Sequence, residues 1–205
     1  MAPALPRFGL ARLVPAIAAV VLGVAGCAPR HAEGPRTYPR QVLIIRHAEK
    51  PPERANSADL SAEGKARAEA LHALFEKSDA RPEPFATPDF IFAASNSGKS
   101  HRPVLTVTPL AARLNLPIDT RFTNDDPADL ARELFGNPRY AGKTVLVSWR
   151  HGATPELAQL LGARGAPLRW QDDVFDRVWE ITYAADGAPT FADRPQRLMP
   201  GDAAE

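Results

Sequence analysis

Three short apolar runs, far apart in the chain, constrain the fold more than any other feature. They cover residues 42–45, 89–94 ("DFIFAA") and 144–149 ("TVLVSW"). Each run is rich in leucine, β-branched or aromatic residues, and none shows the regular polar alternation of a half-exposed strand. This pattern is typical of strands that are buried on both faces, in sheets that helices cover from both sides.

Helical patterns separate the apolar runs. Ser61 is the predicted N-cap of the first helix, and Pro109 is expected to kink or restart the second. Thr154 is the predicted N-cap of the fourth helix, with Pro155 at its first helical position. The four predicted helices cover residues 62 to about 77, 102–114, 127–135 and a segment that begins at residues 154–156.

The last part of the chain has the alternating pattern of an antiparallel hairpin. Residues 178–183 alternate, and Asp186 and Gly187 give a turn signal before residues 189–191. A short strand is also expected within residues 116–121. Strands that alternate with helices predict an α/β fold. We expect three layers, with a mainly parallel sheet flanked by helices and an antiparallel edge hairpin.

The first 26 residues have the pattern of an export signal. Arg7 and Arg12 precede an apolar stretch that ends in small residues before Cys27. The stretch is shorter than the ~20 residues that span a bilayer. Residues 24–27, "VAGC", resemble the lipobox of bacterial lipoproteins, in which the cysteine is acylated and becomes the mature N-terminus. A chance cysteine is the alternative, but Cys27 is the only cysteine in the chain and stands where a lipobox requires one.

The chain therefore divides into four predicted segments. Residues 1–26 are a lipoprotein-type signal peptide, and residues 27–40, with three prolines among charged residues, are a flexible tether. Residues 41–193 form the globular domain, and residues 194–205 are a C-terminal tail. Acyl chains on Cys27 would anchor the protein to a membrane of the cell envelope. Ala28, rather than aspartate, follows the cysteine, which favours the periplasmic side of an outer membrane.

The charge balance gives no indication of a nucleic-acid partner. The signal peptide holds two of the 25 basic residues and no acidic residue, so 23 basic residues remain against 24 acidic ones. Nucleic-acid-binding domains carry a clear basic excess, which this chain lacks. A single cysteine also excludes any intramolecular disulfide.

Polar residues follow each of the three apolar runs directly. Arg46 and His47 follow the first, residues 95–102 ("SNSGKSHR") the second, and Arg150 and His151 the third. Ligands of open α/β sheets bind at the carboxyl ends of the strands. Guanidinium groups match phosphoryl oxygens bidentately, and a neutral imidazole can attack phosphorus. The pattern predicts a phosphoryl-binding pocket, and no ligand spacing in the sequence suggests a metal.

Four segments resemble the motifs of the histidine phosphatase superfamily, which is also called phosphoglycerate mutase-like. "LIIRHAEK" resembles its Arg-His-Gly/Ala-Glu signature, and "LSAEGKARAEAL" its Leu-Ser/Thr-x-x-Gly segment. "ASNSGKSHRPVLTVTPLA" resembles its Ser…Arg-x-x-x-Thr-x-x-x-Leu segment, and "VLVSWRHGATPELAQLLG" the segment with the second histidine. They cover residues 43–50, 60–71, 94–111 and 145–162, in the family's order.

The resemblance implies the roles of individual residues. His47 is expected to be phosphorylated during turnover, while Arg46, Arg102 and His151 bind the transferring group, with no metal or cofactor. The mutase-type branch of the family has a glutamate as proton donor after the third strand, and this chain has Asp125 and Asp126 near that position. Asp125 is the candidate acid, whereas Asp126 is also suited to cap the following helix.

The function predicted for residues 41–193 is therefore that of a histidine phosphatase domain. It hydrolyses a phosphomonoester or related phosphoryl group on a small substrate through phospho-His47. The alternative is a catalytically weak envelope lipoprotein that binds a phosphorylated ligand or a partner protein, because the proton donor is not defined. A mutase is disfavoured, because its specificity determinants are not found in this chain.

Overall fold

The computed structural model describes Met1, residues 37–79 and residues 81–204. Apart from Met1, the predicted signal peptide, together with Cys27 and most of the predicted tether, lies outside the described residues. None of the helices described is long and apolar enough to cross a membrane.

A six-stranded sheet forms the centre of the fold, with the strand order β3-β2-β4-β1-β5-β6. Strands β1 to β4 pair in parallel, and β5 pairs antiparallel with both β1 and β6. The three apolar runs form β1, β2 and β4, which lie side by side in the sheet. The strands are β1 (Gln41–Arg46), β2 (Phe90–Ala93), β3 (Ile118–Asp119), β4 (Thr144–Trp149), β5 (Arg177–Tyr183) and β6 (Pro189–Pro195).

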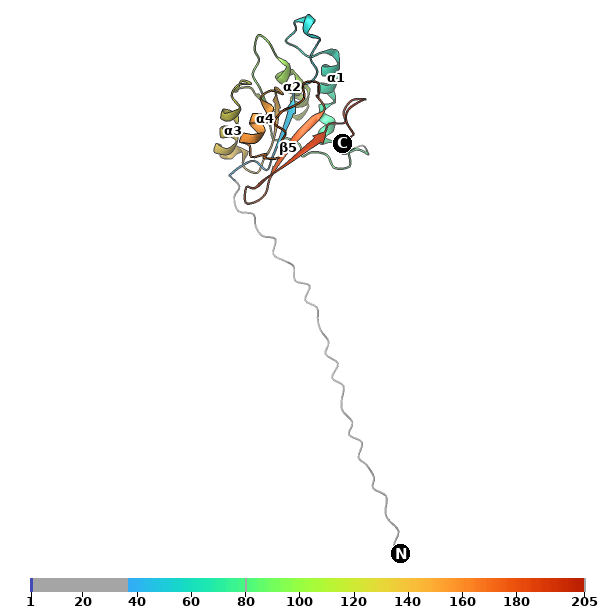
Figure 1. Ribbon diagram of the computed structural model, residues 1–205, viewed down its shortest axis with the longest axis vertical. Helices are drawn as coiled ribbons and strands as arrows, with labels where there is room; N and C mark the ends of the chain where they lie inside the picture. Colours follow the sequence, from blue (N-terminus) through green and yellow to red (C-terminus); the bar gives the residue numbers. More distant parts are fainter. Residues whose placement is uncertain (2–36, 80, 205) are drawn as a thin grey trace. The chain divides into compact units, whose positions relative to one another are not determined.

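Helices cover both faces of this sheet, and Figure 1 shows α3 and α1 on opposite sides of it. Successive residues of β1 point to opposite faces. Ile44 packs in one core cluster with Leu130 of α3, whereas Leu43 packs in the other with Val107 of α2. The helices are α1 (Ala62–Ala70), α2 (Arg102–Leu114), α3 (Pro127–Gly136) and α4 (Thr154–Leu160). The predicted three-layer α/β fold with an antiparallel edge is confirmed.

Three details of the helices test the sequence signals. Ser61 is the N-cap of α1, and its hydroxyl accepts a hydrogen bond from the backbone nitrogen of Gly64 at 3.0 Å. The helix ends at Ala70 and continues as a 3₁₀ helix over Leu71–Phe75, so the single helix expected to residue 77 is wrong in its last part. The tighter turn keeps Leu71 and Leu74 in the core.

Two expectations are wrong, namely the restart of the helix at Pro109 and the N-cap at Thr154. Helix α2 runs unbroken across Pro109, because Val107 and Leu110 on either side of it pack into the same core cluster. Thr154 is the first residue of α4 rather than its N-cap, which is Ala153. The Thr154 hydroxyl instead donates a hydrogen bond to the carbonyl oxygen of Arg150 at 3.0 Å.

The packed part of the chain extends beyond the predicted boundaries at residues 41 and 193. The Tyr38 hydroxyl donates to the carbonyl oxygen of Ala184 at 3.0 Å, and the Gly142 nitrogen donates to the Tyr38 oxygen at 2.9 Å. At the other end, β6 continues to Pro195, and the Asp202 carboxylate accepts two hydrogen bonds from Arg67. Composition alone does not reveal such anchors, since each depends on a distant partner.

Candidate active site

The pairing of β1 with β4 brings two of the predicted strand ends together. Arg46 is the last residue of β1 and pairs with Trp149, the last residue of β4. The His47 nitrogen donates to the Trp149 oxygen at 3.0 Å, which continues the ladder by one residue. The side chains of Arg46 and His47 are buried, although both are polar. Two polar side chains buried at the carboxyl end of parallel strands indicate a ligand-binding site rather than an ordinary connecting loop.

The tautomer of His47 follows from its hydrogen bond. The ring Nδ1 lies 2.7 Å from the carbonyl oxygen of Ala48. A carbonyl only accepts hydrogen bonds, so Nδ1 carries the proton and Nε2 keeps its lone pair. Burial, together with the positive charges of Arg46 and Arg102, lowers the pKa of His47 to about 3. The imidazole is therefore neutral at physiological pH, as a nucleophile must be.

Backbone carbonyls hold the guanidinium group of Arg46. Its Nη1 donates to the oxygens of Asp172 at 2.7 Å and Val174 at 3.0 Å, and to that of Gln171 at 3.2 Å. The Arg46 Cζ atom lies 3.8 Å from the centre of the Phe175 ring. These contacts fix the orientation of Arg46, and no motif in the sequence predicts the role of Phe175.

Unpaired nitrogens remain among the predicted phosphoryl-binding side chains. Within the described part of the chain, Nε of Arg46, Nε of Arg102 and Nδ1 of His151 are buried without a hydrogen-bond partner. A buried donor without an acceptor costs on the order of 1–3 kcal/mol. The side chains of these three residues line one cavity, so an anion in that cavity would meet all three.

Thr106 connects the start of α2 to Ala48, the residue after His47. Its hydroxyl donates to the carbonyl oxygen of Arg102 and accepts from the nitrogen of Ala48, both at 2.8 Å. Arg102 itself donates from Nη1 to the oxygen of Ser57 at 3.0 Å. Thr106 lies within residues 94–111, one of the segments that resemble the family, but no role is predicted for it from the sequence. The structure shows that it links Arg102 to Ala48.

The second histidine and the two aspartates come from other loops. His151 Nε2 lies 3.5 Å from Asp172 Oδ1, and burial together with the charge of Arg46 lowers the pKa of His151. The Asp125 carboxylate accepts a hydrogen bond from Arg150 Nη2 at 3.1 Å. Asp126 occupies the N-cap position of α3, but its carboxylate accepts from the nitrogen and hydroxyl of Thr123 instead of capping the helix.

All five predicted catalytic residues line one cavity of about 440 Å³. This volume suits a small-molecule ligand. Asp125 is the only carboxylate among the described residues that line it. The predicted residues are Arg46, His47, Arg102, Asp125 and His151, and the cavity also contains Lys50, Lys99, Arg150 and several small polar side chains.

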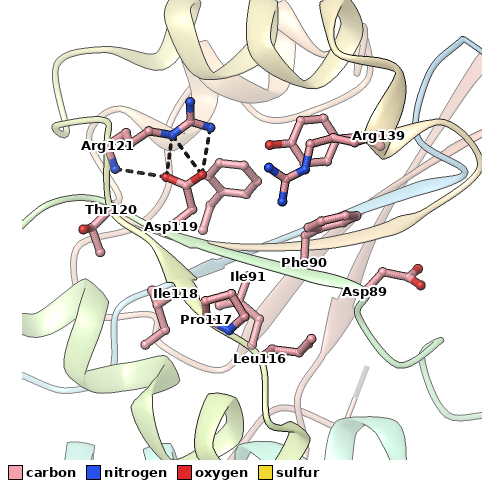
Figure 2. Close-up of a pocket in the computed structure, with 12 residues that line it drawn as sticks. Asp89, Phe90, Ile91, Leu116, Pro117, Ile118, Asp119, Thr120, Arg121 and Arg139 are labelled. Carbon is pink, nitrogen blue, oxygen red and sulfur yellow. Dashed lines mark hydrogen bonds and ion pairs between the residues drawn. The ribbon is translucent and has the colours of Figure 1, made fainter.

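A second cavity of about 470 Å³ lies along β2 and β3, and Figure 2 shows its apolar lining. Its charged groups include the ion pair of Arg121 with Asp119, and Arg139, whose Cζ lies 4.8 Å from the centre of the Phe90 ring. It contains none of the predicted catalytic residues. No cluster of three His, Cys, Asp or Glu side chains suited to a metal occurs among residues 37–79 and 81–204. The two cavities have similar volumes, so the cavity at His47 is distinguished by its basic and polar lining.

Comparisons with known proteins agree with this fold. No family model and no curated protein matches the chain. Among solved structures, the protein histidine phosphatase SixA complexed with tungstate is 16% identical, with a TM-score of 0.55 over 76% of this chain and 97% of that one. A variant phosphoserine phosphatase from Entamoeba histolytica in complex with phosphoserine is 11% identical, with a TM-score of 0.51 over 78% and 98%. The chain therefore shares its fold with these two phosphatases.

Proposed function

We propose that the protein is a phosphatase that hydrolyses a phosphomonoester, or a related phosphoryl group, through a phosphohistidine at His47. The observation that carries the proposal is the state of His47. It is buried, neutral and fixed by the oxygen of Ala48, in the same cavity as Arg46 and Arg102. The ligands named for the two similar structures, tungstate and phosphoserine, support a small phosphorylated substrate.

The proposed reaction has two steps. Nε2 of His47 attacks phosphorus, forming an N–P bond while the ester P–O bond breaks, and the leaving oxygen takes a proton from the carboxyl group of Asp125, which must be protonated and released from Arg150 for this step. The Nδ1 proton stays hydrogen-bonded to Ala48, which stabilises the phosphoimidazolium. Arg46, Arg102 and His151 stabilise the charge on the transferring oxygens. A water molecule then attacks phosphorus, the N–P bond breaks, and the water proton returns to Asp125.

His47→Ala in the full chain tests this mechanism. Turnover of an aryl phosphate should fall to background, because no other group can form the covalent intermediate. Wild type incubated with a radiolabelled substrate should carry an acid-labile, alkali-stable phosphoryl label that the variant lacks. Full activity in His47→Ala would falsify the mechanism. Absence of turnover in wild type, with retained phosphate binding, would favour the alternative of a ligand-binding envelope protein.

The role of Asp125 is tested with phosphate esters of graded leaving-group pKa. A general acid contributes about 10²–10⁴-fold, mostly for poor alkoxide leaving groups. In Asp125→Asn, kcat/KM should depend more steeply on leaving-group pKa than in wild type. Asp126→Asn is the matched control, since Thr123 binds its carboxylate. Equal slopes in all three proteins would exclude Asp125 as the donor.

The proposed location of the protein is the cell envelope, with acylated Cys27 as its membrane anchor and residues 1–26 as the export signal. This rests on the sequence "VAGC". Full-length wild type should sediment with membranes, and Cys27→Ser should be released into the soluble fraction. Equal membrane retention of the two proteins would rule out the lipid anchor.

A further inference from the structure

The cavity at His47 carries more positive charge than one phosphoryl group matches. Five basic side chains line it, and Asp125 is the single described carboxylate there. Lys50 pairs with Glu53, and Arg150 pairs with Asp125. A phosphate ester carries about two negative charges at neutral pH, so about one positive charge remains unmatched when it binds. This cavity is called the cationic cavity below. Its five basic residues are Arg46, Lys50, Lys99, Arg102 and Arg150.

We propose that Lys99 and Arg150 form a second anion-binding subsite, so that the preferred substrate carries a carboxylate or a further phosphate besides the phosphoryl group that is transferred. This inference rests on the proposed function, because it assumes that Arg46 and Arg102 bind the transferred group. The subsite would then recognise the part of the substrate that leaves.

The backbone position of Lys99 places it beside the phosphoryl-binding arginine. The carbonyl oxygen of Lys99 accepts a hydrogen bond from Arg102 Nη2 at 3.3 Å. Reciprocal backbone hydrogen bonds between Ser97 and Ser100 close the turn that carries Lys99. Within the described part of the chain, the ammonium group of Lys99 has no hydrogen bond or ion pair. It is therefore available to a ligand in the cavity.

Arg150 lines the same cavity and directly precedes His151. Its Nη2 donates to Asp125 at 3.1 Å, and its backbone nitrogen donates to Asn124 Oδ1 at 3.1 Å. No other donor of the Arg150 guanidinium is used by a described residue. An arginine has five donors in a fixed fork, so Arg150 can bind a second oxyanion and keep Asp125. The carboxylate of Asp125 also holds Arg150 at the cavity.

An adjacent cavity has mainly negatively charged groups among its charged side chains, unlike the cationic cavity. It is lined by acidic residues that include Glu53, Glu63 and Asp173, and it shares only Lys50 with the cationic cavity. Neither His47 nor Arg102 lines it. A group attached to the transferred phosphoryl therefore meets Lys99 and Arg150 in its own cavity, which favours an anionic rather than a cationic substrate.

Non-hydrolysable phosphonates test the subsite by binding alone. The probes are para-carboxyphenylphosphonate, its neutral carboxamide isostere and its cationic aminomethyl analogue, titrated calorimetrically into the full chain. Exposed ion pairs contribute about 0.2–1 kcal/mol each, so the carboxylate should bind roughly fivefold more tightly than the carboxamide at low salt. The ratio should shrink at high salt, because exposed charges are screened.

Charge-removing variants assign the effect to residues. Lys99→Gln and Arg150→Gln should each lower the ratio of carboxylate to carboxamide affinity by about twofold or more. Arg113→Gln removes the same charge from an exposed position at the far end of α2, where Arg113 pairs with Glu76. It should leave the ratio unchanged.

Other results of these titrations would contradict the proposed subsite. Equal affinity for carboxylate and carboxamide, tighter binding of the aminomethyl analogue, or no binding of any probe would overturn it. A ratio that neither cavity variant changes would overturn the assignment to Lys99 and Arg150. Turnover is measured separately on aryl phosphates, so a failed phosphatase assay with an intact binding ratio would reject the proposed function and keep the subsite.

Discussion

Two groups of charged side chains meet the segment that carries His47, and they differ in how their charges are paired. The buried ion network consists of Glu49, Arg67 and Asp202. Arg67 Nε lies 2.7 Å from Glu49, and Arg67 Nη2 lies 2.7 Å from Asp202, with all three side chains at most 10% exposed. In the cationic cavity, by contrast, neither Arg46 nor Arg102 forms a side-chain ion pair with a described residue, although Lys50 and Arg150 do. The paired charges of the network stabilise the loop, whereas the charges of Arg46 and Arg102 are left for a ligand.

The largest expected effect comes from breaking the buried ion network. Arg67→Ala leaves the carboxylates of Glu49 and Asp202 buried without their partner. Removing one member of a buried pair costs about 3–5 kcal/mol. The free energy of unfolding, measured in urea, should fall by that amount. Arg113→Ala, at an exposed arginine, serves as the control and should change little; an equal loss in both would show that the network does not stabilise the fold.

The matching change in the cationic cavity should affect rate instead of stability. Arg102→Gln removes one charge-stabilising donor, and such losses cost about 10²–10³ in kcat. Its unfolding free energy should change far less than that of Arg67→Ala, because Arg102 has no ion pair with any residue that the structure describes. Steady-state kinetics and urea denaturation on the same sample test both parts. A stability loss as large as for Arg67→Ala would remove the distinction between the two groups.

The neutral state of His47 predicts a pH effect on stability. Above pH 6.5 the imidazole is neutral in both the folded and the unfolded chain. Between 6.5 and the folded pKa of about 3, only the unfolded chain takes up the proton. Stability should therefore fall with decreasing pH, by about 1.4 kcal/mol per unit from this group. Urea denaturation of His47→Asn should show a shallower pH dependence, and an unchanged slope would contradict the buried neutral histidine.

The smallest expected effect concerns Thr106. Thr106→Val keeps the shape of the side chain but leaves the nitrogen of Ala48 without its acceptor, at a cost of about 1–3 kcal/mol. Activity should fall as well, because Ala48 holds the Nδ1 proton of His47. Thr106→Ser retains the hydroxyl and should restore kcat. If serine fails to rescue while the fold is intact, the hydroxyl does not position the loop.

The same contrast separates what sequence reasoning predicted from what it missed. The fold and the positions of Arg46, His47 and His151 follow from apolar runs and from the residues directly after them, which are local signals. Arg67 pairs with Asp202, which lies 135 positions later in the chain. Asp202 belongs to the segment predicted to be a C-terminal tail. The backbone carbonyls that bind Arg46, and the ring of Phe175 that contacts it, cannot be recognised from the pattern of apolar and polar residues. Local order was predictable, whereas long-range partners of charged groups were not.

The position of Asp202 has a consequence for synthesis of the chain. Arg67 leaves the ribosome 135 residues before Asp202 does. At about 5–20 residues per second, that interval lasts on the order of 7–27 s, whereas helices form within about a microsecond. During this time Glu49 is the only member of the buried ion network that can pair with Arg67. For several seconds of synthesis, Arg67 therefore has one of its two carboxylate partners, and the network is complete only when the end of the chain is made.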